Sequence, residues 1–230
     1  DIVALGSTDV AAMSTQQVAA MTTQQVAALS TEQVANLTTN QVAGLGTAQV
    51  AALTTSQVQA LTDTQAVALT TTQVRALETA DVAALDTTDL AAMGTSQIRA
   101  MSTAQIDALG TTQLTSLTTS QIAGLGTAQV ASLATSDLAA LDSGQFVALT
   151  TQQVASLTTA QVSALETTDL VEFSTSQIRA LTTAQIVALE TTQVSALSST
   201  HVSALATSQV RALQTADAAA IDTTDIAAMG

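Results

Sequence analysis

The chain has 230 residues, of which 18 are acidic and four are basic, so its formal net charge is −14. This charge argues against a nucleic-acid partner, which requires clustered Lys and Arg, and the absence of Cys excludes disulfides and thiolate metal sites. The longest apolar run is only a few residues, so no membrane span is predicted. A single histidine, His201, cannot by itself form a His-based metal site or a catalytic triad. No phosphate loop or metal constellation is present either, and we expect no enzymatic activity.

An eight-residue repeat accounts for the whole sequence. Counting from Gly6 to Met229 gives 28 complete octads without insertion or deletion, and residues 1–5 are the end of one more. A fixed period of this kind predicts a repeat architecture, here a single tandem array over residues 1–230. Because both ends fall inside the repeat register, we expect the chain to be an excerpt of a longer array.

Each octad carries the sequence signals of one short helix. Numbering its positions one to eight from Thr70 to Leu77, position one is mostly Ser, Thr, Gly or Asp, and position four is mostly Gln. Ser/Thr-x-x-Gln is the capping box that opens a helix. Positions five and eight are large and apolar, and residues three apart share one face of a helix. Position seven is small, which would let successive helices approach closely, and position six varies and should face water.

These signals predict an all-α solenoid with one short helix per octad, running from about position two to position eight. A single long helix is excluded because eight residues overshoot two turns by about 80°, so the apolar stripe would spiral around it. An isolated helix of this length is unstable, and each must bury positions five and eight against its neighbours. The Thr and Val content leaves a β-solenoid as the alternative.

Taken in order, residues 1–61 are the most regular part of the chain. Octad 62–69 departs from the pattern, with Asp63 in place of Thr at position two. Octad 142–149 is also irregular, with Phe146 at position five. These two octads lie 80 residues apart.

A ten-octad super-repeat overlies the octads, since residues 38–53 closely match residues 118–133. Duplication of an 80-residue block explains it, as would a structural period of the superhelix. Further along, Phe173 and Phe146 occupy apolar positions and are expected in the core. His201 replaces a Gln and is expected to make the same cap contact.

The phrase L-T-T-x-Q-V-x-A-L, as in residues 69–77 and 181–189, resembles tandem repeats of very large secreted or surface proteins of Gram-negative bacteria, which are described as adhesin-like or haemolysin-like. The resemblance covers the entire chain and implies a structural repeat, with no catalytic or binding residues to transfer. A looser likeness to transcription activator-like effector repeats is limited to their helix-opening L-T-x-x-Q-V phrase. Their long repeat and DNA-reading loop are missing, so no DNA binding is inferred.

Acidic residues form the main local clusters. Carboxylates at positions one and four of adjacent octads could supply oxygen ligands to Ca²⁺, whereas acids at a helix N-terminus also cap N–H groups and complement the helix dipole. A regular row of Thr at positions one and two offers a second candidate, an ice-binding face, against ordinary N-capping. The Ca²⁺ candidates are Glu78, Asp81, Asp86 and Asp89.

The role expected from these observations is a structural stalk, spacer or fibre segment of a bacterial surface or secreted protein, located at the cell surface or outside the cell. Its expected partners are neighbouring repeats or further copies in a fibre. The alternative is a binding module, either a Ca²⁺-stiffened adhesin segment or an ice-binding Thr array.

Overall fold

A computed structural model describes residues 2–227, which form short α-helices, a 3-10 helix at Ile2–Ala4 and no β-strand. One α-helix occupies each octad over this range. The all-α prediction is therefore confirmed, and the β-solenoid alternative is wrong for the described residues.

The chain divides into two compact units, Asp1–Gly124 and Leu125–Gly230. The first unit contains α1 (Ser7–Ala12), α2 (Thr15–Ala19), α3 (Thr23–Ala27), α4 (Thr31–Ala35), α5 (Thr39–Gly44), α6 (Thr47–Val50), α7 (Thr55–Gln59), α8 (Asp63–Ala68), α9 (Thr71–Ala76), α10 (Thr79–Val82), α11 (Thr87–Ala92), α12 (Thr95–Ala100), α13 (Thr103–Asp107), α14 (Thr111–Ser116) and α15 (Thr119–Gly124). The second unit contains α16 (Thr127–Ser132), α17 (Thr135–Ala139), α18 (Ser143–Ala148), α19 (Thr151–Ser156), α20 (Thr159–Ser163), α21 (Thr167–Leu170), α22 (Thr175–Ala180), α23 (Thr183–Ala188), α24 (Thr191–Ser195), α25 (Ser199–Ala204), α26 (Thr207–Ala212), α27 (Thr215–Ala220) and α28 (Thr223–Ala227).

Two extended residues separate most consecutive helices. At position one, Thr70 has φ −72° and ψ 158°, and at position eight Leu77 has φ −60° and ψ 142°. The Leu77 N–H donates to the carbonyl of Val74, which closes the last helical turn. The predicted extension of each helix to position eight is therefore wrong, and the helices end at positions five to seven. The residue at position eight must be extended because the chain changes direction there.

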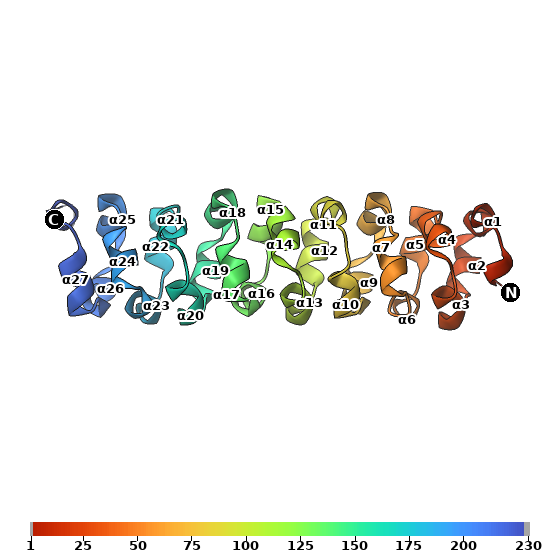
Figure 1. Cartoon of the computed structure of the whole chain (residues 1–230), viewed down its shortest axis with the longest axis horizontal. Coiled ribbons are helices and arrows are strands. Elements are labelled where there is room, and N and C mark those ends of the chain that lie inside the picture. The colour runs from red at the N-terminus through yellow and green to blue at the C-terminus, as the bar shows by residue number, and fades with distance from the viewer. Residues whose placement is uncertain (1, 228–230) are drawn as a thin grey trace. The chain divides into compact units, whose positions relative to one another are not determined.

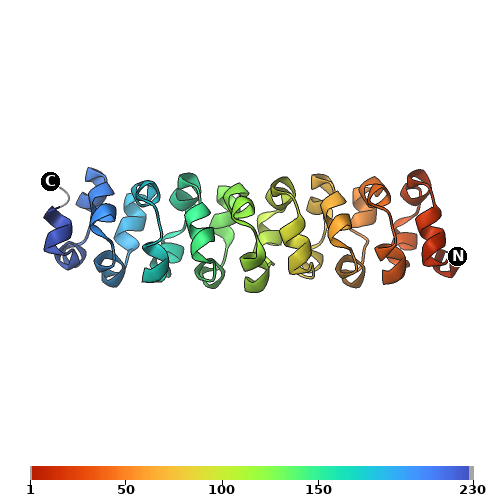
Figure 2. The same cartoon turned by 90° about the horizontal axis from the view of Figure 1, so that it is seen from above.

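Within each unit, helices three apart along the chain pack against each other. In the first unit α8 packs between α5 and α11, and in the second unit α19 packs between α16 and α22. Three octads, or 24 residues, therefore make one turn, and Figures 1 and 2 show these turns stacked within each unit. The eight-residue period of the sequence does not indicate how many helices make one turn.

The octad register continues without a break across the boundary between the units. A single array over residues 1–230 stays a prediction. The super-repeat of ten octads is not a multiple of three octads, so it does not correspond to a whole number of three-helix turns.

The core of each unit is built from positions five and eight, as predicted. From Val10 to Val202, every position-five side chain is at most 1% exposed. Position eight is at most 9% exposed from Met21 to Leu205. Phe146 and Phe173 are fully buried, as expected. The core is thus a column of aliphatic side chains with few aromatic ones.

Positions six and seven also behave as predicted. At position seven, a Cβ added to Gly44 would overlap the Thr15 side chain on the preceding turn, and one added to Gly124 would overlap Thr95. Small residues there permit the close approach of successive turns. The Arg side chains at position six are exposed: Arg75, Arg99, Arg179 and Arg211. Across the described residues, no helix combines the length and the apolar character needed to cross a membrane.

Replacing Thr70 by Ala should lower the free energy of unfolding of the first unit by about 1 kcal/mol, because the Gln73 N–H loses its cap acceptor. The Thr70 Oγ1 accepts that bond at 3.3 Å. Urea unfolding followed by circular dichroism measures the loss. Thr71→Ala, an exposed residue at position two, is the control, and equal losses in the two variants would show that the cap is not the cause.

Candidate functional site

The Gln at position four joins successive turns as well as capping its own helix. In Gln73, Oε1 accepts the N–H of Thr70 at 2.7 Å, as the capping box predicts. Its Nε2 donates to the carbonyls of Val42 and Leu45, both at 2.8 Å. These carbonyls lie at the C-terminal end of α5, where the last carbonyls of a helix lack the usual N–H partner four residues on. The side chain is only 2% exposed, so one buried amide satisfies groups on two turns.

We call this arrangement the glutamine clamp: Oε1 binds the N–H at position one of the same octad, and Nε2 binds the position-eight carbonyl 28 residues earlier. Its hydrogen bonds recur in both units with Nε2–O distances of 2.7–2.9 Å. Further clamps with the same contacts are at Gln33, Gln41, Gln49, Gln57, Gln65, Gln97, Gln105, Gln113 and Gln121, and at Gln153, Gln161, Gln177, Gln185, Gln193 and Gln209.

Sequence reasoning identified the capping box but missed the clamp. A signal was present, because Glu never occupies position four although it serves a capping box as well as Gln does. Only the amide has an N–H to donate to the preceding turn. The absence of Glu thus fits a long side chain that must end in a donor, whereas the shorter Asp, which does occur at position four, makes a different contact.

His201 reproduces the clamp with an imidazole ring. Its Nδ1 accepts the Ser198 N–H at 3.4 Å, and its Nε2 lies 2.9 Å from the carbonyl of Phe173, 28 residues earlier. A neutral ring protonated on Nε2 supplies both functions. The expected cap contact is confirmed, and the inter-turn bond is additional.

Asp at position four lacks the N–H of Gln and makes a different contact. A hydroxyl at position two, 26 residues earlier, donates to one carboxylate oxygen. Thr55 donates to Asp81 at 3.0 Å, and Thr191 donates to Asp217 at 2.7 Å. Ser199 and Asp225 form a third such pair at 2.6 Å. The second oxygen, Oδ2, is buried without a hydrogen-bond partner in Asp81, Asp89, Asp169 and Asp217.

The carboxyl groups of Asp63 and Asp89 face each other at the same 26-residue spacing. Asp89 is 2% exposed, and burial raises its pKa to about 7, helped by a hydrogen bond with Asp63 and by the charges of Asp63 and Asp86. A hydrogen bond from the backbone N–H of Asp86 lowers the pKa of Asp89, but this effect is smaller than the others. In the second unit, burial followed by the charge of Glu166 also raises the pKa of Asp169.

The four predicted Ca²⁺ candidates lie on two consecutive helices and are not gathered into one cluster. Asp81 accepts a hydrogen bond from Thr55, whereas Asp89 faces Asp63 on a different helix. Among residues 2–227, no three His, Asp or Glu side chains are placed to hold a metal ion. Ca²⁺ binding by these residues stays a prediction.

The N-capping explanation of these acids is only partly right. Glu78 and Asp86 occupy cap positions in the expected backbone conformation, yet neither side chain makes a cap hydrogen bond. By contrast, Asp142 accepts the N–H of Gln145 at 2.8 Å. Glu190, like Glu78 and Asp86, makes no side-chain cap hydrogen bond, although the residue at position four of its octad is Gln193. Several Thr and Ser at position one do cap, and an ice-binding role for the Thr rows stays a prediction.

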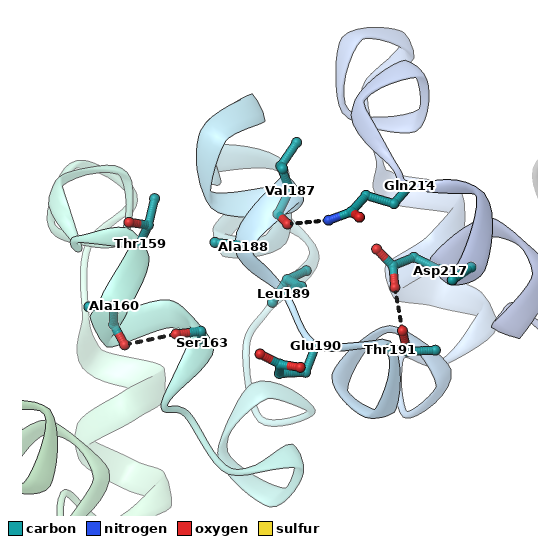
Figure 3. Close-up of a pocket in the computed structure, with 11 residues that line it drawn as sticks. Thr159, Ala160, Ser163, Val187, Ala188, Leu189, Glu190, Thr191, Gln214 and Asp217 are labelled. Carbon is teal, nitrogen blue, oxygen red and sulfur yellow. Dashed lines mark hydrogen bonds between the residues drawn. The ribbon is translucent and has the colours of Figure 1, made fainter.

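A pocket of about 500 Å³ opens in the second unit (Figure 3). It lies where Asp217 takes the place of a clamp Gln, and Leu189, whose carbonyl a Gln would bind, lines it. Thr191 holds Asp217 instead, and Gln214 Nε2 donates to the carbonyl of Val187 at 3.0 Å. The shorter Asp side chain explains the space. The pocket is thus a variant of the contact between turns.

The ALTTAQ repeat family matches the sequence at residues 2–39, 35–63, 42–79, 82–119, 107–135, 130–167 and 162–199. Together these matches cover residues 2–79 and 82–199, and they confirm the predicted tandem-repeat array. Comparison with curated proteins finds no match.

Proposed function

Since the chain belongs to the ALTTAQ repeat family, we propose that it is a non-enzymatic spacer: a stalk or fibre segment of a bacterial surface or secreted protein. The observation that carries this proposal is the recurrence of one clamp, at one spacing, in both units. A contact that recurs at one spacing between successive turns lets length grow in fixed steps, because each turn needs only its neighbours.

The composition supports a spacer exposed to solvent. A net charge of −14 favours solubility and disfavours adhesion to nucleic acid or anionic membranes. The Thr residues at position two are exposed in most of the described octads, whereas few large apolar side chains are. Surface location is tested by antibody binding to intact cells of the source organism, before and after protease treatment; labelling only after lysis would contradict it.

The spacer proposal predicts that three added octads lengthen the first unit by one helix layer, about 8–10 Å. A second copy of residues 38–61 inserted after Leu61 keeps the register. Because the chain has no Cys, spin labels at Gln59→Cys and Asp107→Cys, both exposed, report the distance on either side of the insertion. Pulsed electron paramagnetic resonance should show a narrow distribution shifted by that amount.

A 24-residue Gly/Ser insertion at the same place is the control for this measurement. It should broaden the distance distribution because a flexible linker fixes no end-to-end distance. An octad insertion that behaves like the linker would contradict the stepwise growth on which the spacer proposal depends.

The rival from another class is a Ca²⁺-stiffened binding module. The unpartnered Oδ2 atoms of the position-four Asp residues are the observation that favours it. Calorimetry with Ca²⁺ and thermal melts with and without chelator separate the two. Tight binding that raises the melting temperature would favour the module over the passive spacer.

A further inference from the structure

Asp63 is the only residue at position two of the complete octads that is neither Thr nor Ser. In the same register, the hydroxyl of Thr55 donates to Asp81 and that of Thr191 donates to Asp217. The acceptor facing Asp63 is the carboxyl of Asp89. A hydroxyl always has a hydrogen to donate, whereas a carboxyl has one only when it is protonated.

A hydrogen bond between the carboxyls of Asp63 and Asp89 therefore requires one proton, and it would join two packed helices, α8 and α11. Asp89 Oδ2 has less than 1 Å² of accessible surface and no hydrogen-bond partner, so ionising this carboxyl leaves a buried, unpaired oxygen. We propose that Asp63 and Asp89 form a proton-dependent clasp between α8 and α11, closed by one shared proton and loosened when both carboxyls are ionised.

The groups around the clasp favour the protonated state. Asp86, in the same octad as Asp89, adds negative charge near the carboxyl of Asp89. On α8, Asp63 is the titratable residue that interacts with Asp89. On the other side of α11, the sequence of α14 is Thr-Thr-Gln-Leu-Thr-Ser, which has no charged side chain to act as a counter-ion. Like charges and burial both disfavour two ionised carboxyls at one site.

The direction of the pH effect follows from linkage. The pKa of Asp89 is raised from 3.8 to about 7 in the folded protein. Between these values the folded state holds a proton that the unfolded state has released, so stability falls as the pH rises through this window. The stabilisation by the clasp is therefore complete below about pH 4 and is lost as the pH rises through about 7, where Asp89 ionises in the folded protein.

Thermal melts of the 230-residue chain between pH 5 and pH 8 test the clasp, with Asp63→Thr as the principal variant. This change restores the hydroxyl–carboxylate pair seen at Thr55 and Asp81, so the variant should fold. The melting temperature of the original chain should fall with pH more steeply than that of Asp63→Thr. Asp107→Asn, which removes one exposed charge from the same unit, should keep the original slope.

Carbon-13 NMR of the Asp carboxyl groups gives a second readout that does not depend on unfolding. The resonance that disappears in Asp89→Gln identifies Asp89; that variant carries the usual Gln and should fold. Its titration midpoint should lie near pH 7 and fall by at least about one unit in Asp63→Thr. A midpoint near 4 in the original chain, or a pH slope unchanged by Asp63→Thr, would overturn the proposal. So would a rise in melting temperature on adding Ca²⁺ at pH 8 that Asp63→Thr abolishes, because a cation and not a proton would then close the contact.

Discussion

Replacing Gln73 by Glu should destabilise the first unit by about 3–5 kcal/mol at neutral pH, the usual cost of leaving a buried charge uncompensated. Glu keeps the acceptor that the Thr70 N–H needs, so the capping box survives. Its second oxygen, however, replaces the Nε2 that donates to Val42 and Leu45 at 2.8 Å. A carboxylate would then face two carbonyl oxygens in a site that is 2% exposed. Urea unfolding followed by circular dichroism at pH 7 measures the loss.

Gln25→Glu is the matched control for this experiment. Gln25 forms the same capping box with Thr22, at 2.8 Å, but its side chain is exposed. Its replacement should change stability by less than about 0.5 kcal/mol. The Gln73→Glu loss should also shrink on acidification, since burial raises the pKa of the new carboxyl and its protonated form can again donate. Equal losses at the two positions would mean that the clamp contributes nothing beyond the cap.

Replacing Phe146 by Ala should cost the second unit about 3–5 kcal/mol, because it leaves a large cavity at a fully buried position. Phe146 is 0% exposed, and its ring lies 6.0 Å from that of Phe173. Most octads carry Val or another aliphatic residue at this position, so the surrounding side chains are packed around an unusually large group. The loss should be local, since contacts join neighbouring turns, and amide hydrogen exchange should increase first in α18 and the helices packed on it.

Val147→Ala provides the control for the cavity. Val147 is the next residue on the same helix and is 53% exposed, so its truncation should change the free energy of unfolding by less than about 0.5 kcal/mol. A comparable loss at both positions would indicate that helix propensity, and not core packing, explains the effect of Phe146→Ala.

The residue at position four determines how many hydrogen bonds join one turn to the preceding turn. Gln supplies both an acceptor and a donor, and His201 does the same with its ring. Asp supplies acceptors alone, depends on a hydroxyl from the preceding turn and leaves one oxygen unpartnered at Asp81 and Asp217. The pocket beside Asp217 is the visible consequence of this change. A spacer built from such octads would therefore be stiffest where Gln occurs in unbroken succession.

Features contained within one octad were predictable from the sequence alone. The helix start at Thr71 follows from the capping box of Thr70 and Gln73, and the burial of Val74 and Leu77 follows from their spacing of three. These features depend on residues a few positions apart, whose relative geometry the helix itself dictates.

The end of each helix and the contacts between turns were decided by the tertiary structure. Near-identical octads are compatible with many numbers of helices per turn, since the period of eight says nothing about the angle at the corner. That angle is set by the extended residues at positions eight and one and by how the aliphatic core packs, and here it gives three helices per turn. Only then does Gln73 reach Leu45, 28 residues earlier, and only then does Asp89 meet Asp63. The sequence by itself thus determined the helical repeat and its core, whereas the clamp, the pocket and the acid pair exist because folding brings together residues that no local pattern connects.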